Sequence, residues 1–276
     1  MRVARSFVVL FVIVGLMAGY VQTVVAADAA RIAPVLDRIV AKKELVVGTT
    51  ASMPPFNMTT KDSQVIGMDI DIARLIADSL EVKLTLRTIP FNELLPALEA
   101  GRIDMVLSGM TMTPTRNLKV AFAGPYFGSG KSMLIKEANA ESLNEVSKIN
   151  KSDNVLVALK GSTSQLFVEK VFPKAKLVLT DNYDQAVAMV RENNAHAMVA
   201  DQPICQLSAY RYPDVGLTSL KNTLSYEPIG IAIQANDFLF LNLLQNFITA
   251  MVNSGDLRKL SDRWFQDGAW ISQLPM

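Results

Sequence analysis

Hydrophobic residues along the chain alternate between short continuous runs and segments with helical spacing. In the first half, this pattern predicts strands at residues 44–49, 83–88 and 105–107, and helices at residues 69–80 and 92–100. Asn92 is the expected N-cap of the second helix, because its side chain can accept a hydrogen bond from a free helical N–H group. The β-α-β-α-β order indicates an α/β sheet with largely parallel strands.

A second block of the same kind follows. It has predicted strands at residues 155–158, 176–179 and 195–200, and helices at residues 164–172 and 184–192. The tail adds a strand at residues 229–233, a helix at residues 238–253 and a short helix that ends near residue 265.

Two such blocks predict an α/β protein with two lobes. The chain is expected to cross between them near residues 126–132 and 224–230, where glycine and proline gather. We assign residues 27–128 and 227–276 to the first lobe and residues 129–226 to the second. Two crossing strands would form a hinge, with a cleft between the lobes.

The first residues have the order of a secretory signal peptide. Two arginines precede an uncharged run at residues 7–21, and small residues follow. We predict that residues 1–26 form a cleaved signal peptide, which places the mature protein in the periplasm. An uncleaved membrane anchor is the alternative, although the apolar run is shorter than the ~20 residues that a spanning helix needs.

Charge and cysteine content narrow the class of protein. The chain has a formal net charge of +1, and removal of residues 1–26 takes away two arginines and no acids, which leaves −1. This balance indicates no nucleic-acid partner. The single cysteine, Cys205, excludes an internal disulfide, and with the single histidine, His196, it is too few for a zinc site.

In parallel α/β sheets, ligands bind beyond the carboxyl ends of the strands. Polar, aromatic and charged residues gather at these positions in both blocks. They are Thr50, Met53, Phe91, Ser108, Met110, Thr111 and Arg116 in the first, and Lys160, Ser162, Thr163 and Asp201 in the second. We predict that they form one small-molecule site.

Arg116 and Asp201 come from different lobes and carry opposite charges. A guanidinium is shaped to bind a carboxylate through two parallel hydrogen bonds, and a carboxylate can accept an ammonium group. Thr111 and the N–H groups at the start of the helix near Thr163 can add hydrogen bonds, while Phe91 offers an apolar face. Closure of the lobes would bring both charges onto one zwitterion and exclude water.

Each of these residues also has a simpler interpretation. Arg116 could lie on the surface, Asp201 could cap the helix that follows it, and Phe91 could belong to the core. Residues 161–163 could be an ordinary turn between a strand and a helix. Their joint placement at strand ends in both blocks is what favours a binding site.

The Gly-Ser-Gly-Lys-Ser run at residues 128–132 is not a phosphate-binding loop. The motif needs a glycine at the position that Pro125 occupies. Lys131 also begins an apolar strand rather than a helix, so the run predicts no nucleotide site.

With these motifs, the chain resembles the periplasmic solute-binding proteins of polar amino-acid ABC transporters, family 3 of the bacterial extracellular solute-binding proteins. The same ligand-binding core occurs in ionotropic glutamate receptors. The resemblance covers about residues 45–265, and its markers are residues 47–49, 54–56, 67–72, 95–104, 108–116, 122–126 and 160–163. It implies the type II periplasmic binding protein fold, in which each lobe is a mostly parallel sheet flanked by helices.

The resemblance also implies roles for the site residues. Arg116 would hold the ligand α-carboxylate, helped by Thr111 and Thr163. The α-ammonium would bind to Asp201 and to the carbonyl of Ser108 or Met110. Phe91 would pack on the ligand side chain.

Two positions depart from the family pattern. Many relatives carry an aspartate where this chain has Thr50 and an aromatic residue where it has Met53. The loss of that acid argues against a strictly cationic ligand, and methionine gives an adaptable wall. Lys160 would face the cleft and favour an amide or acidic side chain, or it is a solvated lysine at a strand end.

We therefore expect a monomeric binding protein that needs no metal or cofactor and delivers an amino acid to an ABC import permease. One alternative is an enzyme on the same scaffold, because some relatives are dehydratases of cyclic carboxylates. A general acid or base would then be needed, and Asp201, Lys160 and Glu227 are the candidates. Another alternative is a sensor subunit for a membrane receptor.

Overall fold

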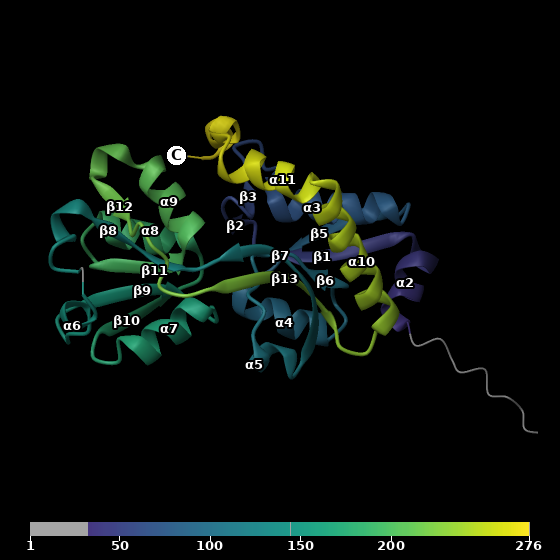
Figure 1. The fold of residues 1–276 in the computed structure, drawn as a ribbon, viewed down its shortest axis with the longest axis horizontal. Helices are drawn as coiled ribbons and strands as arrows, with labels where there is room; N and C mark the ends of the chain where they lie inside the picture. Colours follow the sequence, from purple (N-terminus) through teal and green to yellow (C-terminus); the bar gives the residue numbers. More distant parts are fainter. Residues whose placement is uncertain (1–32, 144, 276) are drawn as a thin grey trace, which may run out of the picture. The chain divides into compact units, whose positions relative to one another are not determined.

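The computed structural model describes residues 33–143 and 145–275 (Figure 1). They contain two five-stranded sheets, one in each lobe, and a small three-stranded sheet. The predicted signal peptide lies outside the described residues. Within the described part of the chain, no helix has the length and apolar character needed to cross a membrane.

The sheet of the first lobe has the strand order β5-β1-β6-β13-β7. Its strands are β1 (Glu44–Thr49), β5 (Lys83–Thr88), β6 (Met105–Val106), β7 (Val120–Ser129) and β13 (Glu227–Gln234). The strand β1 is parallel to β5 and β6, whereas β13 is antiparallel to both β6 and β7. The prediction of parallel pairing therefore holds for the βαβ block and not for the strands that join the lobes.

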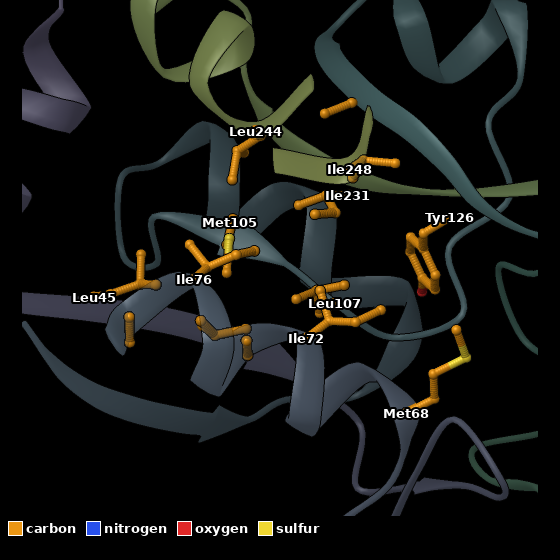
Figure 2. Packing of buried hydrophobic residues seen from close by; sticks show 14 of the residues in the cluster. Leu45, Met68, Ile72, Ile76, Met105, Leu107, Tyr126, Ile231, Leu244 and Ile248 are labelled. Carbon is orange, nitrogen blue, oxygen red and sulfur yellow. The ribbon is translucent and has the colours of Figure 1, made fainter. Parts of the chain in front are cut away.

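Helices bury both faces of this sheet, as expected for a sheet with parallel strands. Helices α3 (Met68–Ser79) and α10 (Phe238–Ser254) lie on one face, where Ile76 and Leu244 join Leu45 and Met105 in the core (Figure 2). Helix α4 (Phe91–Glu99) lies on the other face, where Leu94 meets Val106. The first lobe also contains α2 (Pro34–Lys42), the short α5 (Pro114–Asn117), α11 (Asp256–Phe265) and the 3-10 helix η3 (Gly268–Gln273).

The sheet of the second lobe has the order β10-β9-β11-β8-β12. Its strands are β8 (Lys131–Lys136), β9 (Val155–Leu159), β10 (Lys176–Thr180), β11 (Ala197–Asp201) and β12 (Leu217–Ser219). The three strands of the second βαβ block are parallel, and β8 and β12 extend the sheet antiparallel. Its main helices are α7 (Thr163–Val171), α8 (Tyr183–Arg191) and α9 (Gln202–Arg211), with the shorter η1 (Glu137–Asn139), α6 (Val146–Ile149) and η2 (Pro213–Val215).

Two neighbouring segments connect the sheets. The strand β7 leads into β8 through Gly130 alone, and β12 leads back into β13, which pairs with β7 along its length (Figure 1). A Cβ atom on Gly130 would lie 2.2 Å from the carbonyl oxygen of Ser225, so only glycine fits there without a shift of the backbone. The residues at which each lobe begins and ends stay a prediction.

The predicted strands and helices are confirmed to within two residues, but one cap was wrong and several elements were not predicted. Asn92 is not an N-cap, because α4 begins at Phe91 and Pro90 occupies the cap position. The pattern also missed the helices α2 and α9 and the strand β12. It missed the small sheet formed by β2 (Ser52–Met53), β3 (Asn57–Thr59) and β4 (Val65–Ile66) as well. Strands of two or three residues are too short to show a period.

Candidate functional site

The ends of β1 and β6 meet as the parallel sheet predicts. The backbone N–H of Thr50 donates to the Ser108 hydroxyl at 3.1 Å, and the Thr50 hydroxyl donates to Asn57 Oδ1 at 2.8 Å. Ser108 is fully buried. Both predicted residues thus hold the first-lobe wall together through neutral hydrogen bonds.

A buried carboxylate, Asp69, supports this wall from behind. It accepts hydrogen bonds from the backbone N–H of Gly109 at 2.9 Å, from Asn57 Nδ2 at 2.9 Å and from the Tyr126 hydroxyl at 2.6 Å. Burial raises the pKa of Asp69 to about 6, and the three hydrogen bonds oppose that rise. Gly109 has a φ of +54° and lies against Met53 Sδ, where a Cβ atom would come within 2.4 Å. The turn at Gly109 is therefore held by the Asp69 hydrogen bond and by close packing against Met53.

Arg116 lies on α5, directly after this turn. The helix begins with Pro114 behind the N-cap Thr113, whose hydroxyl accepts the Arg116 backbone N–H at 3.2 Å. The guanidinium donates to the Thr111 carbonyl at 2.8 Å and lies 5.6 Å from the centre of the Phe91 ring. Phe91 is thus both a buried residue and the floor beneath the cation.

The half-buried Arg116 forms no ion pair with an acidic side chain among residues 33–143 and 145–275. Burial lowers the pKa of Arg116 to about 10, and the charges of Glu227 and Asp201 oppose that change. The group remains a cation at neutral pH. A partly desolvated guanidinium without an acidic partner is a binding group for an anion.

The second lobe contacts Arg116 at the start of α7. The guanidinium donates to the Gly161 carbonyl at 3.2 Å, and the Thr111 and Thr163 hydroxyls lie 3.3 Å apart. Ser162 caps α7, since its hydroxyl accepts the Gln165 N–H at 3.2 Å and donates to the Leu159 carbonyl at 2.6 Å. The structure therefore joins the predicted carboxylate-binding residues of both lobes, with the helix N-terminus beside them.

Asp201 ends β11 and forms an ion pair with the buried Lys131. Lys131 Nζ donates to Asp201 Oδ1 at 2.7 Å and lies 3.5 Å from Glu227 Oε2. The Lys131 and Asp201 side chains are 1% and 5% exposed. Asp201 occupies the N-cap position of α9 but makes no side-chain cap bond there. Sequence reasoning missed this pairing, although a lysine that opens the apolar run at residues 131–135 was a signal.

Apolar residues complete the interior of the site. Met53, Phe91, Met110 and Tyr183 belong to one buried cluster that contains residues of both lobes. The sequence analysis missed Tyr183, because this residue at the start of α8 lies in none of the motifs. The Met110 carbonyl, a predicted ammonium acceptor, accepts the Gly230 N–H at 3.1 Å. Its second lone pair remains for a ligand.

Several other residues lie outside this arrangement. Lys160 is exposed and its side chain has no partner in the described structure. His196 Nδ1 accepts the Val155 N–H at 3.0 Å, a structural role. Cys205 is buried, and burial raises the pKa of its thiol. Among the described residues, no cluster of histidine, cysteine and acidic side chains is suited to a metal ion.

A cavity of about 650 Å³ lies elsewhere, between α9, the strand β7 and the C-terminal segment. Phe127, Leu207 and Trp270 are in its walls, and none of the predicted site residues lines it. Its residues offer no pair of opposite charges. We place the candidate site at Arg116 because the chemistry needed for a charged metabolite is there.

The family model of the bacterial extracellular solute-binding proteins, family 3, matches residues 45–267. The chain belongs to this family. Among the relatives of this family 3 protein, a glutamine-binding protein of Geobacillus stearothermophilus is 31% identical over 200 residues, which are 71% of this chain and 74% of the relative. The arginine-binding protein 1 of an Escherichia coli ABC transporter is 25% identical over 231 residues, or 82% and 92% of the two chains.

Solved structures of the family agree with the fold. The crystal structure of an ancestral amino acid-binding protein, a precursor of cyclohexadienyl dehydratase, is 35% identical with a TM-score of 0.78, and the match covers 84% of this chain and 99% of that one. A Wolinella succinogenes protein complexed with lysine is 33% identical with a TM-score of 0.80 and the same coverage. The two-lobed α/β fold expected from the sequence is therefore confirmed.

Proposed function

We propose that this family 3 protein binds a free amino acid in the periplasm and delivers it to an ABC import permease. The observation that carries the proposal is Arg116, a half-buried cation without an acidic partner in the described structure that donates to carbonyls of both lobes. The ligand carboxylate would bind to Arg116, Thr111 and Thr163. Lobe closure around it would create the form that the permease recognises, with the protein acting as a monomer.

The closed form must bind the ligand more tightly than the open form. To shift the protein from almost fully open to almost fully closed, the binding free energies of the two forms must differ by ~5.5 kcal/mol. Contacts to both lobes supply such a difference, since an open protein presents only one half of the site. Arg116 and Gly161 are joined across the lobes at 3.2 Å, so a ligand held there would contact both.

The remaining site residues favour a ligand with a neutral or adaptable side chain. The Thr50 side chain bonds to Asn57 and Ser108, which are both neutral. No acid replaces the aspartate that many relatives carry at this position. Met53 and Phe91 would contact the carbon chain. Met53 is the flexible part of that wall.

A thermal-shift screen against the twenty common amino acids tests the proposal, followed by calorimetry on those that bind. A ligand at one hundred times its Kd should add about 2.7 kcal/mol to the free energy of unfolding. Arg116→Ala should weaken binding by roughly 2–5 kcal/mol, because the carboxylate loses its buried partner.

Lys170→Ala is the matched control, since it removes an exposed cation from the last turn of the same helix, α7. It should leave the affinity close to that of the wild type. An unchanged affinity in Arg116→Ala would refute the placement of the site.

The dehydratase alternative has one observation in its favour, the 35% identity to a dehydratase precursor. Two of the three candidate acids and bases argue against it, and Glu227 is the one that remains. Asp201 is paired with Lys131, and Lys160 is exposed. Incubation with prephenate and a search for an aromatic product would test it, and turnover would displace the proposed function.

A further inference from the structure

Three charged residues form a cluster where the two lobes join. The family resemblance gives a role to Asp201 but none to Lys131 or Glu227. Lys131 opens β8, Asp201 ends β11 and Glu227 begins β13 (Figure 1). The Lys131 ammonium is 2.7 Å from Asp201 and 3.5 Å from Glu227. Ser225 fixes the geometry, because its hydroxyl accepts the Lys131 backbone N–H at 3.1 Å and donates to Glu227 at 3.0 Å.

The cluster contains one more negative charge than positive charge. Lys131 forms its short contact with Asp201, so that carboxylate is already neutralised. Glu227 is farther from the lysine, and its carboxylate also accepts a hydrogen bond from the neutral Ser225 hydroxyl. The uncompensated negative charge is therefore on Glu227, and its side chain is 12% exposed.

Glu227 is placed close to the carboxylate-binding corner by the backbone. The Met112 N–H donates to the Pro228 carbonyl at 2.7 Å, and Thr111 forms a bridge with Ile229. These contacts fasten the segment before Arg116 to the start of β13. The charges of Glu227 and Asp201 both act on the Arg116 guanidinium. A small zwitterion with its carboxylate on Arg116 would therefore have these two carboxylates near its ammonium group.

We propose that Glu227 is the residue that makes the site select ligands with an α-ammonium group, an inference that rests on the proposed amino-acid function. Asp201, paired with Lys131, contributes a neutral dipole, and Glu227 supplies the net attraction for the ammonium. Lys131 sets the size of that attraction by removing one of two negative charges. Free α-amino acids are then distinguished from 2-hydroxy acids that have the same carboxylate and side chain.

The test compares an amino acid with its 2-hydroxy analogue by calorimetry. The amino acid is the best binder from the screen of the twenty, and its analogue is, for example, L-lactate for L-alanine or L-2-hydroxyglutarate for L-glutamate. Wild-type protein should prefer the amino acid. In Glu227→Gln, which keeps the shape and the bond from Ser225, the preference should fall by roughly tenfold or more.

Two further variants sharpen the result. Lys131→Met leaves two negative charges and should raise the preference for the amino acid. Glu93→Gln removes an exposed glutamate of the first lobe and should keep the wild-type ratio. Circular dichroism establishes that each variant is folded, and Glu227→Gln decides the matter if Lys131→Met does not fold.

The outcomes separate this inference from the proposed function. A wild-type protein that binds an amino acid, with an unchanged ratio in Glu227→Gln, overturns only the role of Glu227. Equal binding of the amino acid and the hydroxy acid by the wild type also overturns the role of Glu227. Lys131 would then neutralise the cluster by itself and leave no attraction for the ligand ammonium. Binding of no amino acid overturns the proposed function, and this inference with it.

Discussion

Replacement of the buried Asp69 by asparagine should change how stability depends on pH. The pKa of Asp69 is raised from 3.8 to about 6 because the fully buried carboxylate loses its hydration. Each unit of difference between the folded and unfolded pKa is worth about 1.4 kcal/mol. Ionisation of Asp69 in the native protein therefore costs about 3 kcal/mol of the free energy of unfolding.

The sign follows from proton binding. Between pH 3.8 and about 6, the native state holds the proton of Asp69 while the unfolded state releases it. The contribution of Asp69 is therefore greatest below pH 3.8, falls as the pH rises and is lost above pH 6. Asparagine can keep the three contacts, because its carbonyl can accept both N–H groups and its amide can donate to the Tyr126 hydroxyl.

Urea unfolding at pH 4, 5, 6 and 7 measures the effect. The free energy of unfolding of the wild type, relative to that of Asp69→Asn, should fall by about 2 kcal/mol between pH 4 and pH 7, the larger part of the full effect. Asp78→Asn is the control, since it removes the same charge from an exposed position of the same helix. A difference between wild type and Asp69→Asn that is constant with pH would contradict the reasoning.

Two further predictions concern stability. Asp237→Ala should lower the free energy of unfolding by at least about 2 kcal/mol in urea, since this buried carboxylate accepts N–H groups of Val35, Leu36 and Phe240 at 2.8 Å each. Gly130→Ala should cost roughly 1–3 kcal/mol, because the new methyl group meets the Ser225 carbonyl. A melting temperature equal to that of the wild type would contradict either prediction.

The sequence predicted the site through strand ends, and it failed where the fold brings distant side chains together. Thr50 and Ser108 follow strands that are parallel neighbours, so their contact is a consequence of the βαβ pattern. The pairing of Lys131 with Asp201 depends instead on the antiparallel register between β8 and β11. Nothing in the local pattern of residues 128–136 indicates that register.

The same distinction applies to the secondary structure. Long periodic segments such as α3 and α10 were predicted closely, whereas α2 and α9 were missed. The hairpin β2–β3 and the cap at Pro90 were not predicted either, because both depend on a few residues whose conformation is set by tertiary contacts. Gly67, for example, has a φ of +134° and leaves no room for a Cβ atom against the Phe56 carbonyl.

The position of β13 imposes an order on biosynthesis. This strand lies between β6 and β7, although the ribosome adds it long after both of them, with the whole second sheet in between. The first sheet thus has a gap between β6 and β7 until residue 234 has been added, whereas every strand of the second sheet is complete by residue 219. During synthesis, the second lobe can therefore fold early. The first lobe can complete its sheet only after β13 has left the ribosome.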